Sequence, residues 1–376
     1  MRVNLPEPSA EERAHSERLC GLIRDEIRAN GGAIRFDRYM ELALYAPGLG
    51  YYSAGAEKFG ASGDFVTAPE LGFVFARCLA RAIAPALREK DSEILELGPG
   101  SGALAAELLL ELERLGALPV RYRLLERSAD LRERQHATLR LRCPHLEKLA
   151  VWLDMPPISA WHGVLIANEI IDALPVRLFE LNANDRFERC VGVDGGNRFV
   201  WRTAAADESL ARDVDRVLGD VRQALPRPYR SEICSMLAPW FAEVTRTLSS
   251  GYAWFVDYGH RRNDYYAPTR SEGTVRCHYR HRVHDNPLIL TGLQDITAWV
   301  DFDALSDAAR SSGFQIDELM TQADFLIRNG LEEIFDAAYR ATDDEIERYR
   351  IAQQVKRLTL PDEMGESFKV MAMHRG

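Results

Sequence analysis

The stretch EILELGPGSGALAAELL, residues 93–109, joins an apolar run, a glycine turn and a helix-forming run without a break. This succession is typical of a buried β-strand that turns directly into a helix and holds a ligand at the turn. Gly98, Gly100 and Ala103 fit the G-x-G-x-x-G/A pattern of dinucleotide-binding folds. Gly98, Gly100 and Gly102 fit the tighter G-x-G-x-G turn of S-adenosylmethionine sites. The turn alone leaves both ligands open.

Short apolar runs alternate with helical stretches from residue 91 onward, which predicts an α/β fold with a mostly parallel sheet. Strands are expected at 93–98, 121–126, 148–154, 163–168 and 252–259, helices at 101–116 and 128–142, and a closing strand pair within 314–326 and 368–375.

The rest of the chain is expected to be added to this sheet. An amphipathic helix over 9–30 begins an N-terminal helical and irregular cap, residues 1–90, and the sheet domain occupies 91–376. Two segments interrupt the alternation within that domain. An inserted α+β segment with antiparallel strands is expected at about 177–250, and a polar loop on the substrate side at about 259–293.

Composition excludes several classes of protein. The 376 residues carry a net charge of −10, so the chain lacks the basic bias of many nucleic-acid-binding proteins. No apolar run approaches the ~20 residues that a membrane-spanning helix needs. The N-terminus has neither the apolar core of a secretion signal nor the composition of a mitochondrial transit peptide. We therefore expect a bacterial cytoplasmic protein; nothing in the sequence predicts its oligomeric state.

Cysteine and histidine spacing predicts no metal site. The six cysteines are scattered with no C-x-x-C pair, as expected for reduced thiols. His278, His281 and His284 recur every third residue, a spacing that does not bring three imidazoles together in a strand or loop.

Acids follow the first strands of the predicted sheet. In an open α/β sheet the ligand lies beyond the carboxyl ends of the strands. Glu96 ends the first strand beside the glycine turn, and Glu126 ends the second, where a carboxylate can accept both ribose hydroxyls of a nucleoside. Both cofactor classes use an acid at this point.

The third and fourth strands favour methyl transfer. Asp154 follows the third strand, at a place where methyltransferases often bind the adenine amino group, and Asn168, Glu169 and Asp172 follow the fourth. Hydride transfer has no clear use for so many carboxylates. A cationic sulfonium and an acceptor that must lose a proton do have a use for them.

Five segments occur in an order that is specific to one known family. They are SGDFVTAPELG (62–72), LELGPGSGALAAELL (95–109), ANEIIDALPV (167–176), FVDYGH (255–260) and HRVHDNPLILTGLQDITAWVDF (281–302). With these motifs the chain resembles the MidA-type family of S-adenosylmethionine-dependent methyltransferases, from about residue 15 to the end. Thr291-Gly292 departs from the usual Pro-Gly of the family, as does Gln294 from the small or acidic residue common there.

The resemblance implies a class I, Rossmann-like methyltransferase fold with S-adenosyl-L-methionine as cofactor. For mitochondrial members it implies symmetric dimethylation of an arginine in a core subunit of respiratory complex I. The partner expected here is therefore a protein substrate such as the quinone-site subunit of a bacterial complex I. Carried over by position, the cofactor turn is Gly98, Gly100 and Gly102, the ribose acid is Glu126, and the active-site segment holds Asn168, Glu169 and Asp172.

The irregular N-terminal segment also gains a role from the resemblance. Asp64, Thr67 and Glu70 are expected to fold over the cofactor, with Tyr51 and Tyr52 as a wall. An alternative is a structural turn in which Asp64 and Thr67 cap the short helix that follows.

Arginine is a demanding acceptor because its guanidinium stays protonated and its lone pairs are delocalised. The candidates to orient it and take its proton are Glu169, Asp172 and Asp257, whose individual roles are left open. Three alternatives also stay open: a small-molecule methyltransferase, a nucleotide-dependent oxidoreductase, and an assembly factor without catalytic activity.

Overall fold

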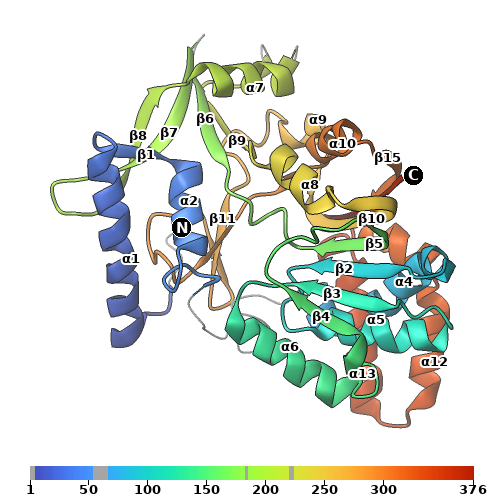
Figure 1. Cartoon of the computed structure of the whole chain (residues 1–376). Coiled ribbons are helices and arrows are strands. Elements are labelled where there is room, and N and C mark those ends of the chain that lie inside the picture. Colours follow the sequence, from blue (N-terminus) through green and yellow to red (C-terminus); the bar gives the residue numbers. More distant parts are fainter. Residues whose placement is uncertain (1–4, 54–66, 183–184, 220–223) are drawn as a thin grey trace. The chain divides into compact units, whose positions relative to one another are not determined.

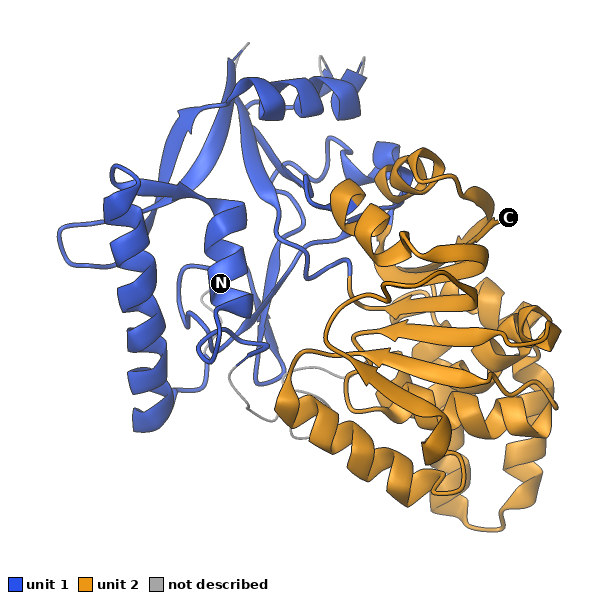
Figure 2. Cartoon of the chain, in the orientation of Figure 1, with its two compact units in different colours: residues 1–65, 171–237, 260–303 blue, residues 66–170, 238–259, 304–376 orange. Residues whose placement is uncertain are grey.

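The structure is a computed structural model that describes residues 5–53, 67–182, 185–219 and 224–376 (Figure 1). The chain forms two compact units, each assembled from three separate segments (Figure 2). Unit 1 consists of residues 1–65, 171–237 and 260–303, and unit 2 of residues 66–170, 238–259 and 304–376. The predicted division at residue 90 is a different partition of the chain and stays a prediction.

Unit 2 contains a mostly parallel sheet. Its strands are β2 (Glu93–Leu97), β3 (Arg121–Leu125), β4 (Ala150–Leu153), β5 (Trp161–Asn168), β10 (Leu248–His260), β15 (Gln315–Thr321) and β16 (Phe368–Arg375). They run in the order β15-β16-β10-β5-β2-β3-β4. The pairs from β10 to β4 are parallel, while β16 pairs antiparallel with both β10 and β15. The five predicted parallel strands and the closing strand pair are confirmed.

Helices cover this sheet, as parallel strands that are buried on both faces require. Those lying wholly or mainly in unit 2 are α3 (Ala68–Leu71), α4 (Phe73–Ile83), α5 (Ala103–Arg114), α6 (Ala129–Arg142), α8 (Leu237–Thr245), α10 (Phe302–Ser311), α11 (Gln322–Arg328), α12 (Leu331–Ala341) and α13 (Glu345–Thr359). Every residue of β2 is buried, and Ile94 lies in one core with residues of α4 and α5. Helices α4, α8 and α11 to α13 were not predicted from the sequence.

The strand order reverses at β2. Strands β3 and β4 follow on one side of β2, and β5 and β10 on the other. The carboxyl ends of β2 and β5 therefore flank a topological switch point, which is where open α/β sheets bind their ligands. The glycine turn at residues 98–102 follows β2 at this point.

Unit 1 contains two antiparallel sheets. Its elements are α1 (Ala10–Ala29), β1 (Ala33–Arg35), α2 (Phe36–Tyr45), β6 (Arg177–Asn182), β7 (Asp185–Val193), β8 (Phe199–Ala205), α7 (Glu208–Leu218), β9 (Tyr229–Ile233), α9 (Arg262–Tyr265), β11 (Arg276–Tyr279), β12 (Arg282–His284), β13 (Asp295–Thr297) and β14 (Val300–Asp301). One sheet has the order β1-β7-β6-β9 with β8 paired to β7, and the other has the order β12-β11-β13. The antiparallel insertion is confirmed, whereas strands β11 and β12 lie in the segment expected to be a loop.

Helix α1 confirms the predicted N-terminal helix. The Ser9 hydroxyl accepts a hydrogen bond from the Glu12 backbone N–H at 3.1 Å, and the Glu12 carboxylate accepts one from the Ser9 N–H at 2.6 Å. This capping box satisfies two N–H groups that a helix start leaves unpaired. Leu19, Ile23 and Ile27 recur at four-residue intervals and are buried.

Candidate functional site

The glycine turn after β2 needs glycine for its backbone. Gly98, Gly100 and Gly102 have φ angles of 57°, 54° and 82°, in the left-handed region that residues with a Cβ disfavour. A Cβ on Gly98 would lie 2.2 Å from Ile170 Cδ1. A Cβ on Gly100 would have no described atom within 4 Å. The turn is closed against the protein at Gly98 and open at Gly100, where a ligand can approach the backbone.

Helix α6 holds the glycine turn from the side. The Gln135 Nε2 donates to the Gly100 carbonyl at 2.9 Å, and the Gln135 Oε1 accepts from Trp152 Nε1 at 2.8 Å. The Thr138 hydroxyl donates to the Ser101 carbonyl at 2.8 Å. Gln135 is fully buried, so its amide rigidifies the turn at a low-dielectric position. Gln135 was not predicted as a site residue, because a glutamine within a polar helix belongs to no recognisable sequence motif.

Glu96 lies beneath the turn rather than at the surface. Its side chain is buried, and its Oε2 accepts a hydrogen bond from the Tyr122 hydroxyl at 2.7 Å. Burial raises the pKa of Glu96 to about 7, against the opposing effect of the tyrosine hydrogen bond. These contacts give Glu96 a supporting position between β2 and β3. Direct contact with a cofactor stays a prediction for this residue.

Glu126 lies where β3 ends, as predicted. Its carboxylate accepts hydrogen bonds from the Ser128 backbone N–H at 2.8 Å and from Gln135 Nε2 at 3.4 Å. Burial raises the pKa of Glu126, although both of these hydrogen bonds lower it. Gln135 therefore links the acid to the glycine turn. The glycine turn and Glu126, which are expected to hold a nucleoside, therefore lie close together at the carboxyl ends of β2 and β3.

Asp154 follows β4 and is exposed. Its carboxylate pairs with Arg132 on α6 at 2.5 Å, and the Arg132 guanidinium also donates to the Glu126 carbonyl. The side chain of Asp154 is 81% exposed. An adenine contact by Asp154 stays a prediction, and it would compete with this ion pair.

Asn168 is the last residue of β5, and Glu169 follows it directly. The Asn168 Nδ2 donates to Glu169 Oε1 at 3.2 Å, while the buried Asn168 Oδ1 has no hydrogen-bond partner in the described part of the chain. Glu169 has a φ of 52°, and its N–H donates to the Val256 carbonyl at 2.8 Å. A left-handed glutamate costs roughly 1–2 kcal/mol, so the neighbouring strand holds it in a strained conformation typical of functional sites.

Asp257 on β10 organises the turn that follows β5. Its carboxylate is buried and accepts the backbone N–H of Ile170 at 3.2 Å and that of Tyr258 at 2.9 Å. Ile170 packs against Gly98, since a Cβ on Gly98 would lie 2.2 Å from Ile170 Cδ1. By holding Ile170, Asp257 supports the glycine turn indirectly. These bonds support a positioning role, and the catalytic role predicted for Asp257 stays a prediction.

Helix α3 contains the end of the GDFVTAPE motif, of which the structure describes residues 67–70. The Ala68 N–H donates to Glu169 Oε1 at 3.3 Å, and the Ser101 hydroxyl in the glycine turn donates to Glu70. Thr67 occupies the N-cap position of α3 without a capping hydrogen bond from its side chain. Asp64 lies outside the described residues. The contacts of Ala68 and Glu70 bring α3 to Glu169 and to the glycine turn, and the folding of Asp64, Thr67 and Glu70 over the cofactor stays a prediction.

Asp172 belongs to unit 1, where it lies near a group of tyrosines. The Tyr45 hydroxyl donates to the Ala173 carbonyl at 2.9 Å, and the Tyr52 hydroxyl donates to the Asp295 carboxylate at 2.9 Å. The rings of Tyr45 and Tyr52 stack with centroids 5.5 Å apart. Burial, followed by the charges of Asp295 and Asp172, raises the pKa of both tyrosines.

We call Tyr45, Tyr52, Asp172 and Asp295 the tyrosine–aspartate cluster. Both aspartates are buried, at 7% and 2% exposed. Their negative charges beside stacked aromatic rings suit a planar cation. The motif around residue 295 was noted in the sequence, but Asp295 was not predicted as a site residue.

Among the described residues, no group of three or more histidine, cysteine, aspartate and glutamate side chains is arranged to hold a metal ion. Within the same residues, no helix is both long and apolar enough to cross a membrane.

Comparison with known proteins decides between the two ligands that the glycine turn left open. Residues 78–320 match the family described as "Putative S-adenosyl-L-methionine-dependent methyltransferase". The chain belongs to this family. Its predicted resemblance to MidA-type methyltransferases is thereby confirmed, and S-adenosyl-L-methionine is its cofactor.

Solved structures support the same assignment. A protein from Burkholderia thailandensis, crystallised with S-adenosylhomocysteine bound, is 39% identical, with a TM-score of 0.93 over 99% of this chain and 95% of that chain. A second structure from Burkholderia thailandensis is 38% identical with a TM-score of 0.90, over the same shares of the two chains. The class I methyltransferase fold is confirmed.

Curated relatives are more distant. The rat protein named Protein arginine methyltransferase NDUFAF7, mitochondrial, is 26% identical over 97% of this chain and 87% of the relative. The zebrafish protein of the same name is 28% identical over 91% of this chain and 83% of the relative.

The residues of unit 2 fit the cofactor. The open face at Gly100 admits a ligand to the backbone, and the carboxylate of Glu126 lies beside it. The Asn168 Oδ1 is a buried acceptor without a described partner. We assign the glycine turn and Glu126 as the residues that would hold the adenosine part. S-adenosyl-L-methionine supplies an electrophilic methyl group when it is bound.

Proposed function

We propose that this methyltransferase modifies the guanidinium of an arginine in a protein, and that the protein is a subunit of respiratory complex I. The arginine is supported by the names of the curated relatives, which are protein arginine methyltransferases. The complex I subunit is supported by the resemblance of the motifs to the MidA-type family. The observation that carries the chemistry is Glu169, an acid held in a strained conformation at the end of β5.

The acceptor side requires carboxylates for two reasons. A guanidinium donates hydrogen bonds from a rigid plane, so a carboxylate that pairs with two of its N–H groups fixes the orientation of that plane. When one nitrogen gains a methyl group, a proton must leave, and a carboxylate can accept it. Glu169 is our candidate for the second task. The Ala68 N–H and Asn168 donate to its Oε1, which holds the carboxylate in place and favours its ionised form, the form that can accept a proton.

Unit 1, taken by itself, contains the tyrosine–aspartate cluster, whose chemistry suits a guanidinium. Asp172 and Asp295 bring two buried negative charges beside the stacked rings of Tyr45 and Tyr52. An arginine side chain matches both features, because its guanidinium is cationic and stacks on aromatic rings. A neutral small molecule would gain less from two buried carboxylates, so the cluster favours a cationic acceptor.

Glu169→Gln tests the proposed role of Glu169. The amide keeps the size of the side chain but cannot accept the proton, so methylation of the acceptor should fall by roughly 10²–10⁴-fold. The affinity for S-adenosylhomocysteine, measured by calorimetry, should stay unchanged. Glu133→Gln on the exposed face of α6 serves as the matched control. An unchanged methylation rate in Glu169→Gln would remove Glu169 from the mechanism.

The acceptor itself is tested in cells. The gene is deleted in its host, complex I is isolated, and arginine methylation is mapped by mass spectrometry, with wild-type and Glu169→Gln complementation. We expect methylation of one complex I subunit to disappear on deletion and to return only with the wild-type gene. Methylation that persists in the deletion strain would refute complex I as the acceptor.

A further inference from the structure

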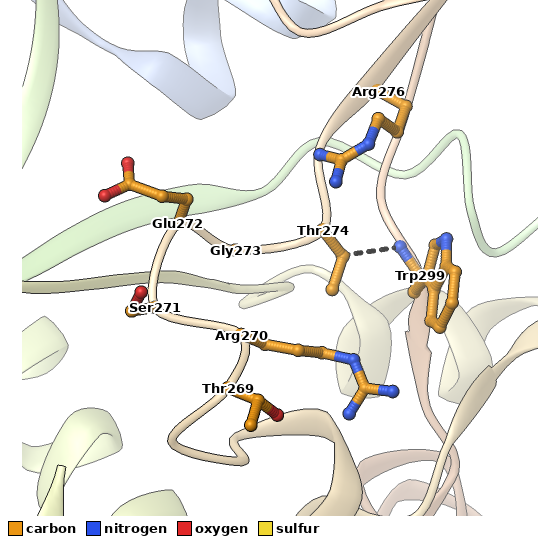
Figure 3. Close-up of a pocket in the computed structure, with 8 residues that line it drawn as sticks. All are labelled: Thr269, Arg270, Ser271, Glu272, Gly273, Thr274, Arg276 and Trp299. Carbon is orange, nitrogen blue, oxygen red and sulfur yellow. Dashed lines mark hydrogen bonds between the residues drawn. The ribbon is translucent and has the colours of Figure 1, made fainter. Parts of the chain in front are cut away.

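Unit 1 contains a pocket of about 210 Å³ (Figure 3). None of the residues that line it was assigned to the cofactor. The segment 269–274, which follows α9, forms one part of its lining, and Arg276 and Trp299 complete it. Ser271 and Glu272 of this segment contact Arg230 of the edge strand β9. The pocket is therefore attached to the edge of the larger sheet of unit 1.

Arg270 is held in the pocket by neutral groups. Its Nη2 lies 2.7 Å from His260 Nε2, and its Nη1 donates to the Asp264 carbonyl. The guanidinium carbon lies 5.5 Å from the centre of a Trp299 ring. Since a guanidinium can only donate, His260 Nε2 must accept, which requires the neutral imidazole with its proton on Nδ1. These contacts fix the position of Arg270 without neutralising its charge.

Arg276 brings a second positive charge to the same pocket. Its side chain is exposed, and its Nη1 donates to the Val275 carbonyl at 2.7 Å. Neither Arg270 nor Arg276 has a carboxylate within 4.0 Å among the residues that the structure describes, whereas Arg230 nearby pairs with Glu180 at 2.7 Å. In Figure 3 the side chain of Arg276 extends toward Thr274, and that of Arg270 extends toward Trp299.

The acids near the pocket are engaged elsewhere. Glu272 pairs with Arg230 at 3.0 Å, and its side chain extends away from Arg270 in Figure 3. Glu232 is buried behind Gly273, where its Oε1 accepts from the Thr274 N–H, the Thr274 hydroxyl and the Tyr265 hydroxyl. Neither carboxylate forms an ion pair within 4.0 Å with the two guanidinium groups, although the pKa of Glu232, which burial raises, is lowered to a lesser extent by the charge of Arg276.

We propose that this pocket binds an oxyanion, either a carboxylate or a phosphate group. Two guanidinium groups provide planar pairs of N–H donors, which match the oxygen atoms of both groups. Ser271 adds a hydroxyl donor to the lining. The chain as a whole has a net charge of −10, which repels anions. Two arginines without carboxylate partners in one pocket create a local positive potential that attracts an anion instead. This site is separate from the glycine turn, which belongs to unit 2.

Calorimetric titration of the full chain tests the site. Sodium phosphate and N-acetylglutamate are titrated separately into wild-type protein at constant ionic strength set with chloride. We expect saturable binding of at least one probe, weakened at least tenfold in Arg276→Ala and in Arg270→Lys. Arg282→Ala is the matched control, since Arg282 is an exposed arginine of the neighbouring strand β12 outside the pocket.

The two probes distinguish the source of the oxyanion. Tighter binding of phosphate would indicate a free or ligand-borne phosphate, and tighter binding of N-acetylglutamate would indicate an acidic side chain of another protein. Thermal unfolding of each variant confirms that it is folded, and Arg276→Ala changes only an exposed side chain. Absence of saturable binding by both probes, or equal affinities in wild type and the two pocket variants, would overturn the proposal.

Discussion

The acids of the two units differ in what surrounds them. In unit 2, Glu126, Glu169 and Asp257 follow or end parallel strands, and each accepts a hydrogen bond from a backbone N–H. In unit 1, Asp295 and Asp172 are buried near the stacked rings of Tyr45 and Tyr52. The acids of unit 2 shape a turn, whereas those of unit 1 suit a cation.

This difference separates two tasks of a methyltransferase. Acids that accept backbone hydrogen bonds at strand ends keep the cofactor site rigid. A rigid site needs less ordering on binding, so less free energy is lost when the cofactor binds. Buried acids beside aromatic rings favour a guanidinium. We therefore expect variants of the glycine turn, Glu96 and Glu126 to change cofactor affinity or stability, and variants of Glu169 and of the tyrosine–aspartate cluster to change acceptor methylation alone.

Asp295→Asn should have a large effect on methylation of the acceptor. The amide can still accept from the Tyr52 hydroxyl, but it loses the charge that would pair with a guanidinium. Truncating one member of a buried charged pair costs about 2–5 kcal/mol, so kcat/KM for the protein acceptor should fall by roughly thirtyfold or more. Affinity for S-adenosylhomocysteine should not change. Asp285→Asn, at an exposed position of the same unit, is the control; a loss of cofactor affinity in Asp295→Asn would break the division of tasks.

Glu96 should make stability depend on pH. Its pKa is about 7 in the folded protein against an ordinary value of 4.5, so the folded state holds the proton more tightly than the unfolded state. The resulting stabilisation is complete below pH 4.5 and is lost as the pH rises through 7. The shift corresponds to about 3 kcal/mol.

Glu96→Gln removes this titration. Urea unfolding at several pH values between 4.5 and 8 should show the free energy of unfolding of wild type falling relative to that of Glu96→Gln as the pH rises. Parallel pH profiles for the two proteins would mean that the buried carboxyl does not titrate in this range.

Glu126→Ala should weaken the cofactor by a smaller amount. Loss of charge-assisted hydrogen bonds to the ribose costs roughly 1.5–3 kcal/mol, which is about a tenfold to 150-fold rise in the dissociation constant of S-adenosylhomocysteine. If Glu126 serves only to hold Ser128 and Gln135, the free energy of unfolding will fall in Glu126→Ala, while the dissociation constant of S-adenosylhomocysteine stays the same.

The sheet of unit 2 could be predicted because its signals are local. Ile94, Leu95 and Leu97 make the run 93–98 mostly apolar, as expected of a parallel strand that is buried along its length. The topological rule then places Glu126 and Glu169 at the carboxyl ends of neighbouring strands. Gln135 could not be predicted, since its buried amide depends on how α6 packs against the glycine turn.

Unit 1 could be predicted only in part. The antiparallel strands of 177–205 have alternation and turn residues, which sequence analysis detects. The tyrosine–aspartate cluster brings together three segments that are far apart in the chain, so no local pattern indicates it. The short strands β11 and β12 were missed because their polar, three- and four-residue sequences resemble a loop.

The glycine turn is the place where the cofactor is expected to bind, and the assignments of the other site residues depend on it. Gly100 and Gly116 form a matched pair for testing it, because both have a left-handed φ, 54° and 63°, and neither would place a Cβ within 4 Å of a described atom. Valine at either position therefore carries a similar backbone penalty, but only Gly100 lies in the turn between β2 and α5.

Calorimetric titration with S-adenosylhomocysteine, done on wild type, Gly100→Val and Gly116→Val after each is shown to be folded, is the most direct measurement. The account predicts that Gly100→Val loses binding by at least a hundredfold and that Gly116→Val binds like wild type. Wild-type affinity in Gly100→Val would contradict the account and place the cofactor elsewhere.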